Sequence, residues 1–335
     1  MVLLLSLGLA AAAGSAYAYP WPLKPFDRQH PIRGSFGDPR TLFEDPLYAD
    51  GLNGPGSFTF HNGVDISAPD GTDVYPVASG IAHLLDGTAV AVDTGDGRTF
   101  QYFHVIPQVI DGQQVRARET VLGQIEAPYA HVHLSEIDGD RITNPLELGH
   151  LTPYRDRTHP IVDSIELRNV AGRRIGLLGV CGRVTIVAAA RDAPPLPVPG
   201  SFAGLPIAPA LVSWQLERVG HGVVVPTTVV ADFRATLPAP RDFWTVYARG
   251  TYENAPRFGR QQFQAMPGRF LFMLDPSLET KTLRNGLYAV HVTAMDERGN
   301  TGSLTERFWV LNVPTPTGCQ TPPPATTTAT TTTTP

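Results

Sequence analysis

Two short stretches constrain the fold more than any other part of the sequence: His61-Asn62-Gly63-Val64-Asp65 and His131-Val132-His133. In each stretch two histidine or aspartate side chains have an even spacing, so on extended backbone both point to the same face. Apolar residues occupy the opposite face, namely Phe58, Phe60, Val64 and Ile66 around the first pair and Val132 and Leu134 around the second. This alternation is typical of strands that bury one side in a core. We therefore expect the two polar pairs to lie on a β-sheet, where they can meet.

Histidine and carboxylate side chains are ligands that zinc accepts. A zinc site carried by a helix would need a His-Glu-x-x-His string, which the sequence lacks. Taken alone, His61 and Asp65 also fit a polar strand face. His131 and His133 alone also fit a surface position or a cupin fragment, but Glu136 follows too closely for a cupin. Together the two pairs predict a zinc site built on a sheet.

Short apolar segments separated by glycine turns recur between Arg33 and Glu136. The run Ala68-Pro69-Asp70-Gly71-Thr72 predicts a tight turn. Residues 89–93 and 98–104 predict a hairpin, with Tyr102 and His104 on one face. No segment in this range has convincing helical periodicity, so the first domain is expected to be nearly all β.

The order of these residues is similar to that of a known family. His61-x-x-x-Asp65, Tyr102-Phe103-His104-Val105 and His131-Val132-His133, with turn glycines between them, resemble the M23 metallopeptidases of the lysostaphin and LytM type. The resemblance covers residues 33–137 and implies an antiparallel β-sheet peptidase domain. It also implies a substrate, the peptides of peptidoglycan, and a cofactor, Zn²⁺.

The resemblance assigns a role to each polar residue. In the family, the residues at the positions of His61, Asp65 and His133 hold the zinc ion, and those at His131 and His104 are the catalytic histidines. Three protein ligands leave zinc one position for water, whose pKa the metal lowers toward about 7. Imidazoles then suit the proton transfers of peptide hydrolysis. We assign no catalytic role to a glutamate.

Two features depart from the family pattern. Members commonly have a glycine- and serine-rich loop before His-x-His, whereas this chain has the short segment Gln124-Ile125-Glu126-Ala127-Pro128-Tyr129-Ala130. Because that loop walls the substrate groove in the family, the difference bears on substrate choice more than on chemistry. The chain also has an insertion between Gly37 and His61, placed where it can cap the groove.

Composition excludes several other classes of function. The 335 residues are 42% hydrophobic and 17% charged, an ordinary globular mixture with room for two domains. The net charge is -5 and the basic residues are scattered, which argues against binding to nucleic acid or an anionic membrane surface. P-loop, dinucleotide and G-x-S-x-G strings do not occur. We expect a monomer.

Both ends of the chain predict segments outside the folded domains. Residues 2–13 are apolar and lead to Ala16-Tyr17-Ala18, which predicts a signal peptide over 1–18 cleaved before Tyr19, although its positive n-region is missing. The run is shorter than the roughly 20 residues of a membrane span, so we favour secretion, without membrane insertion after cleavage, over an N-terminal anchor. Residues 314–335, rich in threonine and proline, predict a disordered tail.

The sequence has two cysteines, Cys181 and Cys319, too few for a thiolate zinc cluster. They can form a disulfide in an oxidising compartment. Alternatively, Cys181 is buried in a strand and Cys319 is unpaired in the tail.

Residues 158–313 predict a second β domain. Alternating segments at 161–167, 184–190, 211–216, 223–233, 243–249, 270–274, 287–295 and 307–311, with a hairpin turn at 296–300, are typical of an immunoglobulin-like β-sandwich. The proline-rich run 193–209 can instead divide the region into two smaller units. Trp214, Trp244 and Trp309 fit strand cores, so we expect a spacer or docking domain rather than a ligand platform.

The sequence as a whole predicts a secreted zinc metalloendopeptidase of the cell envelope, with its peptidase domain at 19–157. The alternative is a catalytically inactive M23-like envelope-binding or regulatory module, which the altered segment before His131 motivates. A third idea, in which the sandwich binds glycan and the metal is structural, fits less well because a closed site needs no additional imidazoles at His131 and His104.

Overall fold

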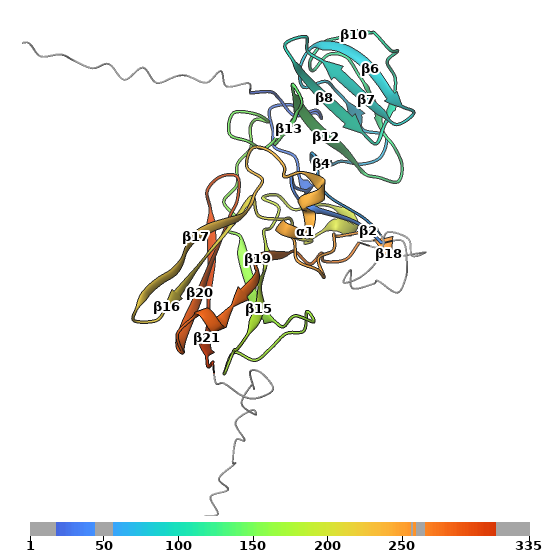
Figure 1. Cartoon of the computed structure of the whole chain (residues 1–335). Helices are drawn as coiled ribbons and strands as arrows, with labels where there is room; N and C mark the ends of the chain where they lie inside the picture. The colour runs from blue at the N-terminus through green and yellow to red at the C-terminus, as the bar shows by residue number, and fades with distance from the viewer. Residues whose placement is uncertain (1–17, 44–55, 256, 259–264, 313–335) are drawn as a thin grey trace, which may run out of the picture. The chain divides into compact units, whose positions relative to one another are not determined.

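The structure, a computed structural model, describes residues 18–43, 56–255, 257–258 and 265–312 (Figure 1). The tail at 314–335 and all but the last residue of the predicted signal peptide lie outside the described residues. Most of the secondary structure is β-strand, with short 3₁₀ turns and one four-residue helix, α1 (Phe243–Val246), in the described part. The all-β class predicted from the sequence is confirmed. No helix of the described residues is both long enough and apolar enough to cross a membrane.

Contacts divide the chain into two compact units. Unit 1 comprises Met1–Ile32 and Asn62–Asp156, and unit 2 comprises Arg33–His61 and Arg157–Pro335. The segment 33–61, which the sequence analysis placed within the first domain at 19–157, thus belongs to unit 2. The chain passes from unit 1 to unit 2 and back before it leaves unit 1 for the last time.

Unit 1 contains a long antiparallel sheet with the strand order β1-β4-β12-β8-β7-β6-β10, and β13 pairs with β12. A smaller sheet has the order β5-β11-β9. The strands are β1 (Ile32–Gly34), β4 (Val64–Ser67), β5 (Asp73–Val74), β6 (Gly80–Asp86), β7 (Ala89–Asp93), β8 (Arg98–Phe103), β9 (Val105–Pro107), β10 (Gln114–Val115), β11 (Gly123–Ile125), β12 (His131–Asp138) and β13 (Arg141–Thr143).

The core of unit 1 follows from alternation along its central strands. Val64 and Ile66 of β4 and Val132 and Leu134 of β12 are fully buried, as the sequence predicts for the apolar face. Tyr102 of β8 is also buried, and its hydroxyl accepts a hydrogen bond from the Val77 backbone N–H at 2.8 Å. The polar residues of β4 and β12 are therefore left on the opposite face.

Two details of the predicted strands are wrong. Residues 58–66 do not form one strand, because β3 (Gly56–Phe60) ends before His61 and β4 begins at Val64. Likewise β8 ends at Phe103, and His104 has a φ of 61°, so the alternation that would place His104 beside Tyr102 stops before it. In both places the chain turns at a predicted site residue.

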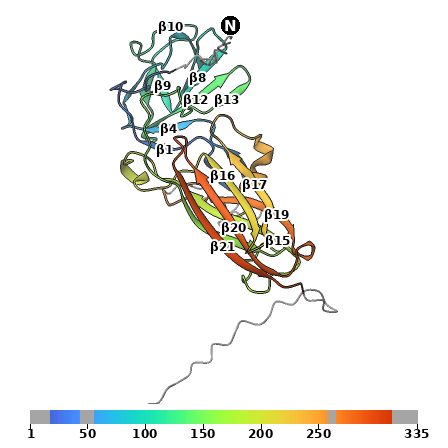
Figure 2. The ribbon, with the colours of Figure 1, turned by 90° about the vertical axis from the view of Figure 1, so that its left-hand side faces the viewer.

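Of the sheets in unit 2, two are antiparallel with the orders β14-β15-β19 and β17-β16-β20-β21 (Figure 2), and a third has the order β18-β2-β3. Strands of one sheet contact strands of the other, as β14 does with β20 and β21. The strands are β14 (Ile161–Arg168), β15 (Arg183–Arg191), β16 (Leu211–Arg218), β17 (Gly222–Asp232), β19 (Leu271–Glu279), β20 (Gly286–Met295) and β21 (Thr301–Val310). The hairpin predicted at 296–300 joins β20 to β21. The immunoglobulin-like assignment stays a prediction.

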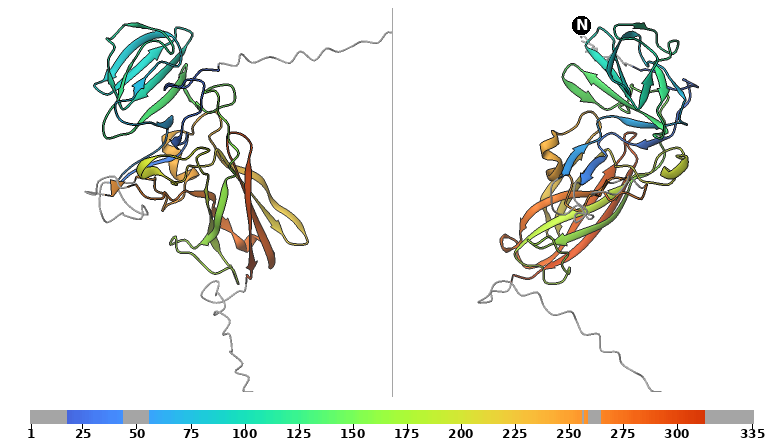
Figure 3. Two further views of the ribbon diagram at one scale, coloured as in Figure 1. Left: turned by 180° about the vertical axis from the view of Figure 1, so that it is seen from behind. Right: turned by 90° about the vertical axis from the view of Figure 1, so that its right-hand side faces the viewer.

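The described ends of the predicted insertion form part of unit 2. β2 (Pro39–Phe43) pairs with β3, and β18 (Arg257–Phe258) adds a short parallel strand to β2. Phe60 is buried with its ring centroid 5.7 Å from that of Phe233 and 5.4 Å from that of Phe243. The blue strands β2 and β3 lie beside α1 in both views of Figure 3. The described end of the insertion at β3 contacts α1. Residues 44–55 lie outside the described residues, so the expectation that the insertion caps a groove stays a prediction.

Unit 2 also corrects two predictions. Residues 243–249 were expected to be a strand, but the buried side chains Phe243 and Val246 are three residues apart and lie on one face of α1. Trp309 was expected in a strand core, and it is 44% exposed on β21.

Cys181 is disulfide-bonded, and the only other cysteine of the sequence, Cys319, lies outside the described residues.

Candidate metal centre

Asp65 lies at the middle of the polar face that β4 and β12 share. In the antiparallel register, His133 of β12 is directly opposite Asp65, and His131 is opposite Ser67. The Asp65 side chain is 12% exposed. Its Oδ1 atom is 3.1 Å from His133 Nδ1 and 3.4 Å from His131 Nε2. One carboxylate oxygen therefore faces both imidazoles of the His-x-His motif.

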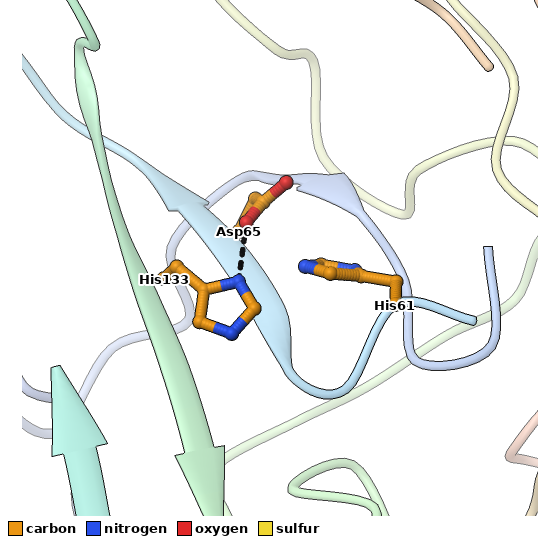
Figure 4. A group of neighbouring side chains, drawn as sticks. All are labelled: His61, Asp65 and His133. Carbon is orange, nitrogen blue, oxygen red and sulfur yellow. Dashed lines mark hydrogen bonds and ion pairs between the residues drawn. The ribbon is translucent and has the colours of Figure 1, made fainter. Parts of the chain in front are cut away.

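His61 reaches the same place from the turn between β3 and β4 (Figure 4). It is buried, and its Nδ1–H donates a hydrogen bond to the Ser35 carbonyl at 2.8 Å. Its backbone N–H donates to the Asp38 carbonyl at 2.8 Å. Because the Nδ1 position carries the proton, the lone pair of this neutral imidazole is on Nε2, where it can bind a metal.

The ligand atoms of His61, Asp65 and His133 all lie within 4.8 Å of one another. Two imidazoles and one carboxylate are a donor set that zinc accepts with a fourth position open. The nitrogen of each histidine that would not bind the metal has a partner, since His133 Nε2 is 2.8 Å from the Ser135 hydroxyl and His61 Nδ1 is bonded to Ser35. The Ser35 carbonyl fixes the His61 tautomer that has its lone pair on Nε2. His133 Nδ1 faces the Asp65 carboxylate at 3.1 Å and would give up its proton there when a metal binds, with the Ser135 hydroxyl as the partner of Nε2. The residues therefore fit a zinc ion.

Gly63 lets the His61 turn approach β12. A Cβ atom at this position would clash with the Leu134 carbonyl oxygen and would lie 2.7 Å from His133 Nε2. Any side chain at residue 63 would thus displace either the strand backbone or the candidate ligand. No role for Gly63, Ser35 or Ser135 was predicted from the sequence. A glycine between two candidate ligands was the only signal for them in the sequence.

His131 and His104 lie next to each other beside the three candidate ligands. Their ring centroids are 4.6 Å apart. The Nδ1–H of His131 donates to the Tyr129 carbonyl at 2.9 Å, so its Nε2 faces Asp65. The Tyr129 ring stacks on His104 with a centroid distance of 4.0 Å and an interplanar angle of 20°. The structure brings all five sequence-predicted site residues together, with two imidazoles outside the group of three.

Glu136, on the same strand, belongs to a separate polar cluster. It is buried, and it accepts hydrogen bonds from the Tyr19 hydroxyl at 2.5 Å and from His150 Nδ1 at 2.7 Å. The hydrogen bond to Glu136 raises the pKa of His150, against the opposing effect of burial. Burial, with Glu136 nearby, raises the pKa of Tyr19. Glu136 thus has structural partners and is not part of the candidate metal centre.

Comparison with solved structures finds similarity over part of the chain. A catalytic-domain mutant of the prophage-encoded M23 protein EnpA from Enterococcus faecalis is 22% identical, with a TM-score of 0.26, over 40% of this chain and 98% of that one. A zinc-containing peptidase from Vibrio cholerae is 20% identical, with a TM-score of 0.28, over 38% and 39% of the two chains. Solved M23 peptidases are among the structures to which this chain is similar.

The deep-sea M23 metalloprotease pseudoalterin is another similar structure, with 16% identity and a TM-score of 0.27 over 48% of this chain and 94% of that one. No family profile and no curated protein matches the chain.

Proposed function

We propose that this chain is a secreted zinc metalloendopeptidase that hydrolyses peptide bonds of peptidoglycan. The observation that carries the proposal is the convergence of His61, Asp65 and His133 with two further imidazoles beside them. A purely structural metal site needs only its ligands, whereas hydrolysis also needs groups that move protons. The additional histidines therefore favour a hydrolase.

In this proposal His61, Asp65 and His133 hold Zn²⁺, which when bound would activate a water molecule and polarise a carbonyl group. His131 keeps its Nδ1 proton on the Tyr129 carbonyl, so its Nε2 atom is the one that accepts a proton or donates it to the leaving amine. His104, beside His131, is the second donor, placed to stabilise charge that develops on the substrate oxygen. The buried Asp65 carboxylate orients the set.

The substrate class and the location rest on the sequence. The motifs that resemble M23 peptidases support peptidoglycan stem or cross-bridge peptides as the substrate. The apolar run at 2–13 and the small residues before Tyr19 support export to the cell envelope. We propose a monomer that acts there, with the second β domain as a spacer or docking domain.

The proposal predicts that zinc and activity depend on the same side chains. The purified chain should bind about one zinc ion and release new amino termini from isolated sacculi, and a chelator should abolish the release. His61→Ala and His133→Ala should lose both properties, with at least a hundredfold loss of zinc affinity, since each removes one of three ligands. Metal analysis and mass spectrometry of the released fragments measure these effects.

His83→Ala is the matched control, because His83 is an exposed histidine on β6 of the same unit. It should keep both zinc and activity. Zinc binding without any release of amino termini would contradict the peptidase proposal and support the inactive envelope-binding module. Absence of zinc binding in the unsubstituted chain would refute the peptidase proposal.

A further inference from the structure

Tyr129 contacts both proposed catalytic histidines and has no role assigned so far. It belongs to the short segment before β12, where the sequence departs from the M23 pattern. Its ring stacks on His104, its carbonyl accepts the Nδ1–H of His131, and the side chain is 40% exposed. One residue thus contacts both imidazoles that lie outside the candidate metal group.

The segment that carries Tyr129 is anchored at both ends within unit 1. Glu126 N–H donates to the His104 carbonyl at 2.9 Å, and Tyr129 N–H donates to the Glu126 carbonyl at 3.0 Å. At the other end, Ala130 N–H donates to Asp70 Oδ1 at 2.7 Å. These bonds fix the backbone beneath the Tyr129 ring, so the ring has a defined position against His104.

The backbone on both sides of the stack has an uncommon conformation. Three non-glycine residues of the described chain have a positive φ, and two of them are His104, at 61°, and Ala130, at 50°. Such conformations cost free energy and persist where the surrounding structure holds them, often at functional sites. Here they turn His104 out of the β8 alternation toward Tyr129 and His131.

We propose that Tyr129 is a positioning residue of the site, whose ring holds the His104 imidazole in place beside His131. This inference rests on the proposed function and adds a residue to it. A partly buried imidazole at the end of a strand still has several rotamers, and a ring at 4.0 Å that lies nearly parallel to it restricts them. In the segment before His131, this chain thus has one aromatic side chain where M23 members commonly have a glycine- and serine-rich loop.

The test uses three variants of the full chain: Tyr129→Ala, Tyr129→Phe and Trp309→Ala. Trp309, on β21 of unit 2, is a matched control because it is an aromatic residue of similar exposure, 44% against 40%. The first measurement is the NMR signals of the His104 ring in the metal-free protein, which do not depend on catalysis. The second is kcat and KM for a peptidoglycan peptide with the zinc-loaded protein.

Tyr129→Ala should shift the His104 ring signals downfield, because the shielding by the stacked ring is lost, and should lower kcat about 10- to 100-fold with a smaller change in KM. Tyr129→Phe should retain both the signals and kcat, since it keeps the ring. Trp309→Ala should change neither. Unchanged His104 signals in Tyr129→Ala, or an equal loss of kcat in the Phe and Ala variants, would overturn the inference.

The two proposals fail separately. If the unsubstituted chain cleaves no peptide, the proposed function fails, and the His104 signals alone decide whether Tyr129 holds that ring. If cleavage occurs and Tyr129→Ala leaves it at full rate, the peptidase stands and the role of Tyr129 is refuted.

Discussion

Three imidazoles at the candidate site, those of His61, His131 and His133, each have a polar partner at the ring nitrogen that faces away from Asp65. Ser35, Ser135 and Tyr129 provide the partners, two of them through backbone carbonyls. A fixed tautomer reduces the reorganisation that metal binding requires, which raises affinity. The centre is therefore preorganised by residues that are not ligands themselves.

Substitution of Gly63 tests whether the candidate metal centre depends on the close packing of this residue against β12. Gly63→Ala should destabilise the protein by about 1 to 3 kcal/mol, because the added methyl group overlaps the Leu134 carbonyl and His133. It should also weaken zinc binding at least tenfold, since His133 must move. Urea unfolding and zinc titration measure the two effects.

Gly87→Ala is the control, because a Cβ atom there would meet no atom within 4 Å. Its stability should change by less than about 0.5 kcal/mol. Equal effects of the two substitutions would contradict the argument that Gly63 is needed for the close approach to β12.

The sequence identified the polar residues of the site but not the residues that support them. His61, Asp65, His104, His131 and His133 could be found because spacing and motif order mark them. Ser35 acts through its carbonyl group, which every residue possesses, and so leaves no trace in the sequence. Gly63 matters because it has no side chain, and the need for that is visible only in its packing against Leu134 and His133 of β12.

Among the elements, β12 connects the candidate centre to the remainder of unit 1. One part of this strand carries His131 and His133, and Glu136 further along contacts Tyr19 and His150. The second cluster ties the start of the described chain to the sheet, since the Tyr19 backbone N–H also donates to the His150 carbonyl at 3.1 Å.

This cluster makes the stability depend on pH. The Glu136 hydrogen bond raises the pKa of His150 above its ordinary 6.5, so protonated His150 favours the folded state. The contribution is fully present below about pH 6.5 and is lost as pH rises through the folded-state pKa. His150→Gln should therefore cost on the order of 1 to 2 kcal/mol near pH 6 and less near pH 9. Urea unfolding at both values measures it, and a cost that grows with pH would contradict the assignment.

Strand prediction succeeded where one face is buried and failed where the chain turns. The segment predicted at 287–295 matches β20 closely because alternation is strong there. The strand predicted at 243–249 is wrong because its first four residues, which form α1, are mostly apolar and show no clear period. The buried side chains Phe243 and Val246 have the spacing of one helical turn. Near His61, β3 and β4 belong to different sheets but are separated by three residues, so the sequence pattern suggests a single strand.

For the whole molecule, the two compact units defined by residue contacts do not have the boundaries of the domains predicted from the sequence. Residues 33–61 lie within the range of the resemblance yet belong to unit 2. Asp38 is buried there, and its Oδ1 accepts a hydrogen bond from the Ala208 N–H at 2.7 Å. The Tyr247 hydroxyl donates to the Gly37 carbonyl at 2.7 Å. No spacing rule foresees these partners, because they are more than a hundred residues away.

A fragment of residues 19–157, the domain predicted from the sequence, should therefore fold poorly. It would retain Asp38 and Phe60 but lose Ala208, Phe243 and Tyr247, which bury them in unit 2. We expect aggregation and zinc affinity at least tenfold below that of the chain beginning at Tyr19, measured by sedimentation and zinc titration. A soluble fragment with unchanged affinity would contradict this expectation.

The burial of Tyr19 bears on the cleavage position that the sequence predicts. Its hydroxyl group is a partner of the enclosed Glu136 carboxylate, and it directly follows the predicted cleavage position. Trimming one residue further along would delete the phenol and leave Glu136 with one donor fewer. The predicted cleavage position is thus the last one that keeps this interior contact in the folded protein.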